Sequence, residues 1–415
     1  MNASPILTSS PQTNTKTPVW KISPSDGKYL INSVAVSADG DRVVAGTFFH
    51  TYGANESRRG PARRSVSSSE NGTFGTYCYD ATGRRLWANE FTGWQGVYWV
   101  AISADGAKAA AGGLMAESPQ AGFVRAFDVH GTGKVLLDYP TKQRVNQVIL
   151  SRDGEWLVSA AETLVLFRYD PKKGGSYVQS DEFTPVSATV LSSYPNAIVS
   201  VGISADGATI VYADYSGNIG VFANDAGKLT LRKGWKLPSS FCHMLQLTPD
   251  GRAFSAGGAA GTFYWCDTER FVADGTPTIA YSTGLSEAVY GVAIAEKGDV
   301  FAGVVNVGDT GRAYAVTVAD FAPQVTDQFT ILRNPNSASL NLAHGLLAVA
   351  DGHPDVTPGH FYLFSGIVSA GEPMVAPLLR WVFETGNMSW PVVISANGKA
   401  VVGGSDDTCV YYFTP

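Results

Sequence analysis

The sequence has few charged residues and no long run of charged or of apolar ones. Charged residues make up 16% of 415, and 30 basic against 36 acidic side chains give a net charge of -6. Without an extended basic cluster, a broad nucleic-acid or anionic-membrane surface is not expected. No stretch approaches about 18 consecutive apolar residues, as a membrane-spanning helix requires. We therefore expect a soluble, cytoplasmic protein with no nucleic-acid or membrane partner.

Cysteine is also scarce, and its spacing fits no familiar framework. Cys78, Cys266 and Cys409 each lie in an apolar, strand-like run, Cys242 stands apart, and no CxxC pair occurs. Neither a disulfide nor a zinc framework is expected from this spacing. Free cysteine behaves as a small hydrophobic residue, so we expect four buried thiols.

Common catalytic signatures are missing too: there is no Walker loop, no GxSxG motif, no HExxH motif and no glycine-rich turn opening a helix. Glycine, in contrast, is abundant at 45 residues, beside 45% hydrophobic and 11% aromatic residues. Many short strands separated by glycine turns fit this composition better than long charged helices.

One short pattern recurs along the chain: an alternating apolar run, a turn with glycine, and a second alternating run. It is clearest as NSVAVSADGDRVVAGT from Asn32, YWVAISADGAKAAAGG from Tyr98 and WPVVISANGKAVVGGS from Trp390. Each copy is typical of a β-hairpin. Further copies begin at Asn146, Val199, His243 and Tyr290, and a degenerate copy, HGLLAVADG, begins at His344.

Most copies are followed by a third strand-like run, and several by a fourth that carries tryptophan, as at Trp87, Trp235 and Trp381. Three to four antiparallel strands in each unit of about 40 to 50 residues is the pattern of a propeller blade. The sequence therefore predicts an all-β fold, a β-propeller of eight four-stranded blades. The alternative is seven blades, if the copy at His344 belongs to a neighbouring blade.

The two ends of the sequence predict how the ring closes. The last copy stops at a third strand, residues 409–413, and residues 18–23 around Trp20 can supply the missing fourth strand. This pairing would leave no open sheet edge. We therefore expect a disordered tail over residues 1–17 and a single propeller domain over residues 18–415.

The SADG hairpins resemble those of the WD40 and YVTN propellers and of the quinoprotein-like propellers of bacteria. YDATGRRLW, from Tyr79 to Trp87, is similar to the tryptophan-docking motif of eight-bladed quinoproteins, in which an Asp, a Gly and a Trp tie neighbouring blades. It is one residue short between Asp80 and Gly83, the vicinal cysteine pair of quinone-binding dehydrogenases is absent, and no copy has the combined Gly-His and Trp-Asp signature of regular WD40 repeats. The resemblance implies the fold, and we expect no cofactor.

Registering the copies places one set of residues where the channel-lining strands begin, at the mouth of the propeller. The set combines amide, imidazole and aromatic side chains, a mixture typical of ligand sites. The alternative is that the polar residues only face water and the aromatic ones only cap the sheets. The predicted mouth residues are Asn32, Tyr98, Trp99, Asn146, His243, Tyr290, His344 and Trp390.

Two enlarged loops are expected on the same face. HTYGANESRRGPARRS contains His50, Arg58 and Arg59, and arginine clusters suit carboxylate or phosphate recognition, although a solvated loop is the simpler interpretation. DGHPDVTPGH, residues 351–360, offers histidine and aspartate, which are suitable metal ligands. Its spacing matches no established signature and its prolines indicate a tight turn, so no metal site is expected.

Two functions remain open at this point. The first is a binding platform that holds a small molecule, a peptide or a protein at the mouth. The alternative is a cofactor-independent lyase or hydrolase for a small anionic or sugar-like substrate, with His243 or His344 as base and Tyr98 or Tyr290 as acid. Arginines of the first loop would then neutralise the substrate.

Overall fold

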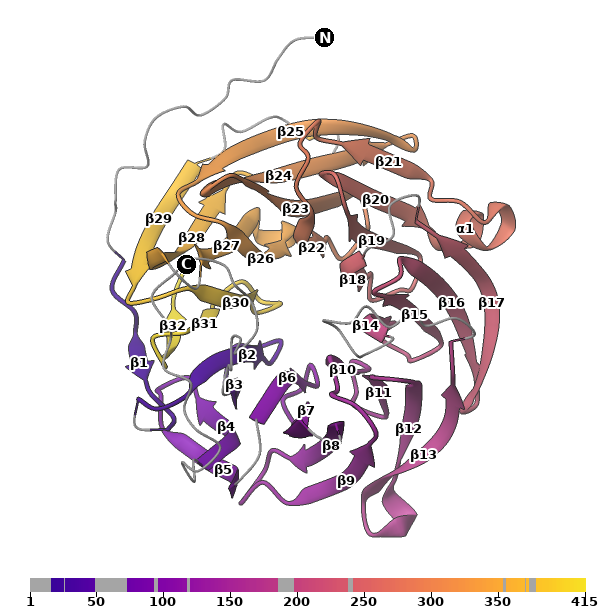
Figure 1. The fold of residues 1–415 in the computed structure, drawn as a ribbon, viewed down its shortest axis with the longest axis vertical. Helices are drawn as coiled ribbons and strands as arrows, with labels where there is room; N and C mark the ends of the chain where they lie inside the picture. Colours follow the sequence, from indigo (N-terminus) through magenta and orange to yellow (C-terminus); the bar gives the residue numbers. More distant parts are fainter. Residues whose placement is uncertain are drawn as a thin grey trace.

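Antiparallel sheets stand around a central axis, and the chain passes from each sheet to the next around the ring (Figure 1). This arrangement confirms the predicted all-β propeller. The computed structural model describes residues 16–25, 27–48, 73–92, 96–117, 120–185, 198–237, 242–353, 356–369, 371–372 and 378–415. The tail predicted over residues 1–17 lies almost wholly outside the described residues.

Strands follow one another outward from the axis in each sheet. The innermost are β2 (Leu30–Val36), β6 (Gly96–Ile102), β10 (Gln147–Leu150), β14 (Ile198–Ile203), β18 (Cys242–Leu247), β22 (Val289–Ile294), β26 (Pro335–Asn341) and β30 (Ser389–Ile394). The second are β3 (Arg42–Phe48), β7 (Lys108–Glu117), β11 (Trp156–Ala160), β15 (Thr209–Asp214), β19 (Ala253–Gly258), β23 (Val300–Val307), β27 (Leu346–His353) and β31 (Val401–Ser405).

The outer half of each sheet is built in the same way. The third strands are β4 (Thr73–Asp80), β8 (Gln120–Asp128), β12 (Leu164–Asp170), β16 (Asn218–Asp225), β20 (Thr262–Asp267), β24 (Thr310–Ala319), β28 (Val356–Ser365) and β32 (Val410–Phe413). The outermost are β5 (Arg85–Thr92), β9 (Val135–Thr141), β13 (Ser176–Phe183), β17 (Lys228–Lys236), β21 (Ile279–Ser282), β25 (Ala322–Ile331), β29 (Leu378–Thr385) and β1 (Trp20–Ile22).

Helices are short in the described part of the chain: α1 (Thr268–Asp274) and the 3-10 turns η1 (Pro171–Lys173) and η2 (Leu342–His344). No helix among the described residues has the length and apolar character needed to cross a membrane. Hydrogen bonding groups the strands into four-stranded sheets, with one exception. The strands β2–β5 and β6–β9 form one eight-stranded sheet, joined by the single residue pair Phe48 and Gly96.

The second strands are buried on both faces, because each sheet is covered by the sheet before it and the sheet after it. Glycine in these strands lets the next sheet approach: a Cβ atom on Gly46 would lie 2.4 Å from the Val97 side chain, and one on Gly112 would lie 2.4 Å from Val145. Small residues in the repeat are therefore contact points between sheets. All four cysteines are free and buried, which confirms that prediction.

Tryptophan docking ties successive sheets at their outer parts. Trp87, on β5, donates from Nε1 to the carbonyl oxygen of Val129, the residue after β8, at 3.1 Å. A Cβ atom on Gly133 would lie 2.5 Å from the Trp87 ring, so this glycine forms the surface on which the indole rests. Trp20 makes the same contacts, with a hydrogen bond to the Ala81 carbonyl at 3.1 Å and its indole against Gly83.

The N-terminal strand completes the sheet formed by the C-terminal strands, and Figure 1 shows indigo β1 beside yellow β32. Trp20 pairs with Tyr412 and Ile22 with Val410. The rings of Trp20 and Tyr412 stack at 5.3 Å between centroids. Because Trp20 also bonds to Ala81, strand β1 joins the last sheet to the first.

A belt of backbone hydrogen bonds links the turns between first and second strands, and we call it the turn belt. Each of its hydrogen bonds runs from a backbone N–H to a carbonyl oxygen in the next turn. The pairs are Ala38 to Ala104, Ala104 to Arg152, Arg152 to Ala205 and Ala205 to Pro249, at 2.9, 2.9, 3.1 and 2.6 Å. Asn397 donates to Ala38 O at 2.9 Å and extends it. Pro249 has no N–H, so it cannot donate onward.

Candidate functional site

A β-bulge re-aims one residue at the start of almost every innermost strand. In β2, Ile31 pairs with Thr47 and Ser33 with Gly46, so Asn32 has no partner in the ladder. The same irregularity occurs in β6, β14, β18, β22, β26 and β30. Bulges turn side chains away from the normal alternation. We call the residues at this position the bulge ring: Asn32, Tyr98, Asn146, Val199, His243, Tyr290, Asn336 and Trp390.

Hydrogen-bond donors alternate around the bulge ring with aromatic or aliphatic side chains. Each donor reaches the backbone carbonyl at the start of the following innermost strand, so its polar group links two neighbouring innermost strands. The bonds are Asn32 Nδ2 to Tyr98 O at 2.7 Å, Asn146 Nδ2 to Ile198 O at 2.7 Å, His243 Nδ1 to Tyr290 O at 2.9 Å, and Asn336 Nδ2 to Ser389 O at 2.9 Å.

His243 is therefore held in one tautomer. A backbone carbonyl only accepts, so Nδ1 of His243 carries the hydrogen that Tyr290 O receives. Burial lowers the pKa of His243 below its ordinary value, and the hydrogen bond to Tyr290 opposes that shift only in part. The imidazole is neutral at physiological pH as a result.

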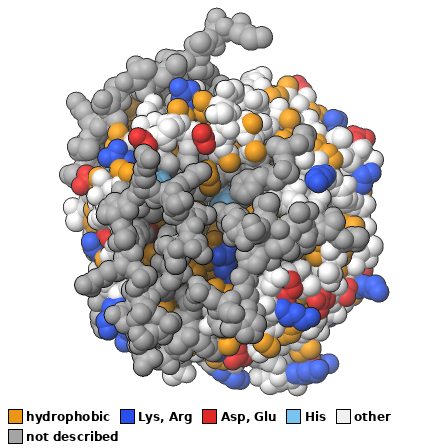
Figure 2. Space-filling model, viewed as in Figure 1, with side chains coloured by type: hydrophobic (Ala, Val, Ile, Leu, Met, Phe, Trp, Pro, Cys, Tyr) orange, Lys and Arg blue, Asp and Glu red, His pale blue; other side chains and the backbone are white. Residues whose placement is uncertain are grey.

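Aromatic rings from separate sheets meet beside this imidazole. The rings of His243 and Tyr290 are 5.5 Å apart between centroids at 64°, and those of His243 and Trp390 are 6.0 Å apart at 70°. Both contacts are edge-to-face, the geometry that aromatic quadrupoles favour. Three predicted mouth residues, from β18, β22 and β30, thus come together. The space-filling view shows histidine and basic side chains near the middle of one face (Figure 2).

A second cluster lies at the starts of β2, β6 and β10 and includes Arg144, which the sequence analysis missed. The Arg144 guanidinium carbon lies 4.2 Å from the centroid of the Tyr98 ring. Its Nε and NH2 groups donate to Asn146 Oδ1 at 3.1 and 2.9 Å. Phe48 packs edge-on against Tyr98 at 5.5 Å. Arg144 precedes the repeat, so registering the copies could not reveal it.

The structure places two predicted mouth residues elsewhere. Trp99 is half-buried and packs against the apolar cluster that includes Val145 and Val148, rather than joining the rings beside His243. His344 lies in η2, the exposed turn after β26, and its ring packs where a Cβ atom on Gly398 would be, 2.5 Å away. The predicted position of His344 at the mouth is wrong.

Asn336 occupies the ring position assigned to His344. The predicted register starts at β27 instead of β26, because the turn NLAHG replaces the SADG turn seen in other copies. Asn341 takes the place of the serine that begins the SADG turn in regular copies. Its Nδ2 donates to Ser395 O at 2.9 Å, and its Oδ1 accepts from the His344 amide at 3.2 Å. The alternating run PNSASLN was the signal that could have corrected the register.

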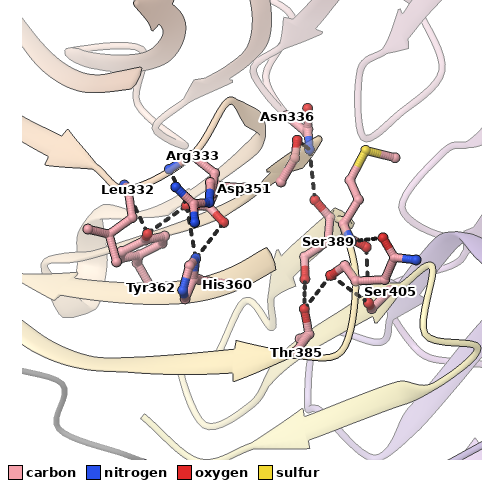
Figure 3. A network of polar contacts seen from close by, with 12 residues as sticks. Leu332, Arg333, Asn336, Asp351, His360, Tyr362, Thr385, Ser389 and Ser405 are labelled. Carbon is pink, nitrogen blue, oxygen red and sulfur yellow. Dashed lines mark hydrogen bonds and ion pairs between the residues drawn. The ribbon is translucent and has the colours of Figure 1, made fainter. Parts of the chain in front are cut away.

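A buried polar network supports the segment that leads to Asn336 (Figure 3). Asp351, which is fully buried, accepts from His360 Nδ1 at 2.9 Å, from the Tyr362 hydroxyl at 2.6 Å and from the Arg333 amide at 3.0 Å. Burial and the neighbouring Asp351 carboxylate raise the pKa of Tyr362 well above its ordinary value. The network fixes the backbone before β26 and, through it, the bulge ring.

The structure describes only part of the two enlarged loops. His50, Arg58 and Arg59 lie outside the described residues. Among the residues that the structure describes, no three histidine, cysteine or acidic side chains are grouped as a metal site. His360, from the second loop, is paired with Asp351 inside the sheet.

The sheets, the tryptophan docking and the bulge ring define a WD40-like β-propeller. No known family model matches the sequence, and no curated protein matches it at the sequence level. Among solved structures, Sqt1 of Chaetomium thermophilum bound to the N-terminus of ribosomal protein L10 has a TM-score of 0.70 at 12% identity, covering 95% of this chain and 98% of that one. A second Sqt1 structure from the same organism gives 0.69 at 13% identity, covering 94% and 98%. At this identity the likeness shows the fold alone.

Proposed function

We propose that this protein is a binding platform that holds a peptide segment of a partner protein at the bulge ring. The observation that carries the proposal is the meeting of His243, Tyr290 and Trp390 from three separate sheets. Trp390 is partly exposed, and its indole N–H has no hydrogen bond among the described residues. Aromatic side chains with an open polar edge on a rigid frame are typical anchors of protein recognition.

The polar groups of the bulge ring favour binding over acid–base chemistry. Backbone carbonyls accept hydrogen bonds from the side-chain amides of Asn32, Asn146 and Asn336, and from Nδ1 of His243. Such bonds hold the sheets at fixed spacing, which preorganises the aromatic surface. The solved Sqt1 complex, with its bound ribosomal protein N-terminus, offers a precedent for peptide binding by this fold.

The same proposal includes a specific architecture. Counting β2–β5 and β6–β9 as two blades joined by one residue pair, the propeller has eight blades and forms one domain over residues 18–415. The pairing of β1 with β32 and the docking of Trp20 on Gly83 support this closure.

A display experiment with short random peptides tests the function. Peptides selected on the wild-type protein are measured by fluorescence polarisation against Trp390→Ala, Trp390→Phe and Leu231→Ala. Leu231 lies on the outermost strand β17 and is 48% exposed, so it serves as the control. Loss of a central aromatic anchor should weaken binding by about tenfold or more.

Binding that Trp390→Phe partly retains, and that Leu231→Ala leaves unchanged, would support the proposal. Melting temperatures of all variants show whether each is folded. Selected peptides that bind Trp390→Ala as tightly as the wild type would overturn it, and so would a selection that enriches no peptide.

A further inference from the structure

Arg144 is a cation held at the bulge ring without an acidic partner. Arg125, Arg168 and Arg232 each pair with a carboxylate, at 3.1, 2.8 and 2.9 Å. For Arg144, no carboxylate lies within ion-pair distance in the described part of the chain; its contacts are the Tyr98 ring and Asn146. Arg144 is also half-buried, so part of the hydration of its guanidinium has been removed without an opposite charge to replace it.

The neighbours of Arg144 fix its orientation. Asn146 uses Nδ2 on the Ile198 carbonyl, so its Oδ1 must face the guanidinium. The Tyr98 ring supports one face of the guanidinium plane, as cation–π pairs do. Glu162 accepts from the amides of Lys142 and Gln143 at 2.8 and 3.2 Å and thereby holds the segment that leads to Arg144.

This geometry leaves one edge of the guanidinium for a ligand. Nε and one hydrogen of NH2 are used on Asn146, while NH1 and the other hydrogen of NH2 have no acceptor among the described residues. Those two nitrogens form the parallel fork that binds a carboxylate through both of its oxygens. A side chain already fixed for such a bond loses little conformational entropy when the bond forms.

We propose that Arg144 anchors a carboxylate of the bound peptide, so that the partner of the bulge ring is an acidic peptide segment. The proposal rests on the proposed function and adds the charge of the partner. Although the chain has a net charge of -6, the cluster at Tyr98 and Asn146 presents the cation of Arg144. The carboxylate is either a side chain of the peptide or its C-terminus, and both have the same chemistry.

A double-mutant cycle tests this pairing. Peptides selected on the wild-type protein are compared with versions in which each Asp is replaced by Asn, each Glu by Gln, or the C-terminal carboxylate by an amide. Each version is titrated against the wild type, Arg144→Gln, Arg144→Lys and the control Arg168→Gln. Arg168→Gln removes the same charge at an exposed position on strand β12.

We expect Arg144→Gln to weaken binding of the acidic peptide by about tenfold or more. The same substitution should have little effect on binding of the one neutralised version that lacks the anchoring carboxylate. Arg144→Lys should recover only part of the affinity, because lysine lacks the fork. The version that abolishes the coupling identifies a side chain or the C-terminus as the source.

Coupling below about twofold, or an equal loss with Arg168→Gln, would overturn the inference about Arg144. Selected peptides without acidic groups that still require Trp390 would also overturn it and leave the proposed function standing. Peptides that require neither residue would contradict both proposals.

Discussion

The imidazole of His243 donates to the carbonyl oxygen of Tyr290 at 2.9 Å, in the position where Asn32, Asn146 and Asn336 use an amide for the same bond. One hydrogen-bonding role is thus filled by two residue types around the bulge ring. Of these residues only histidine changes its charge near neutral pH, so only at His243 does acid place a charge at this buried position.

Substitution of His243 by asparagine should therefore make folding less sensitive to pH. Burial lowers the pKa of His243 in the folded protein, so the unfolded chain binds the proton more readily. The free energy of unfolding of the wild type should be highest above the ordinary histidine pKa, near 6.5, and should fall as the pH drops below that value. Urea unfolding between pH 8 and pH 5.5 measures the difference between wild type and His243→Asn. An equal pH dependence in both proteins would show that His243 is not the titrating group.

At high pH the variants His243→Asn and His243→Ala should differ in their free energy of unfolding. Asparagine can keep the hydrogen bond to the Tyr290 carbonyl, whereas alanine removes that hydrogen bond. We expect His243→Ala to cost about 1 kcal/mol more than His243→Asn. Urea unfolding at pH 8 measures this difference, and equal stabilities would mean that water replaces the bond.

The closing strand should contribute strongly to stability. Trp20 is 8% exposed, stacks on Tyr412 and bonds to Ala81, so Trp20→Ala removes packing at two sheets. We expect a loss of about 3 to 5 kcal/mol in the free energy of unfolding. Val19→Ala is the matched control, because Val19 is 56% exposed. A similar small loss for both variants in denaturant titration would show that the ring closes without this strand.

The repeat was predictable where the chain keeps one local pattern. Regular copies begin at Asn32, Tyr98 and Tyr290, and the structure places each of these residues at a bulge, at the same end of its strand. Alternation and glycine turns are local signals, so a single copy carries enough information for its own hairpin. The register failed at His344, where the turn has a different sequence.

Contacts between copies could not be predicted in the same way. The position of Arg144 over Tyr98 depends on two sheets meeting at a fixed spacing, and no local pattern records that distance. The Asp351 and His360 pair was interpreted as part of a turn, yet both side chains face into the sheet because β28 pairs with β27 at this point. Long-range pairing decided these side-chain environments.

The turn belt makes a prediction about hydrogen exchange. The amides of Ala104 and Arg152 belong to turns, and Arg152 is exposed, yet each donates to the next sheet. They should exchange slowly, since exchange requires local separation of two sheets. The amides of Asp105 and Asp153, one residue later, have no backbone acceptor among the described residues and should exchange fast. Equal rates in exchange monitored by NMR would mean that the belt does not persist in solution.

Gly131 and Gly133 offer a direct measure of tryptophan docking. Both have positive φ, +70° and +73°, so alanine is strained to a similar degree at either position. Nothing lies within 4 Å of a Cβ atom on Gly131, whereas one on Gly133 would lie 2.5 Å from the Trp87 ring. Gly131→Ala should cost about 1 kcal/mol through the backbone alone. Gly133→Ala should cost more, by about 1 to 3 kcal/mol, because the indole must move away from its hydrogen bond to Val129.

Trp87→Phe tests the origin of that difference. If docking is responsible, the extra cost of Gly133→Ala over Gly131→Ala should shrink in the Trp87→Phe background, since the smaller ring leaves room for a methyl group and makes no hydrogen bond to Val129. Denaturant titrations of the single and double variants give the coupling free energy. If the extra loss of stability is the same in the Trp87→Phe background, its origin is the turn itself. Contact with the indole would then not explain why glycine is required at position 133.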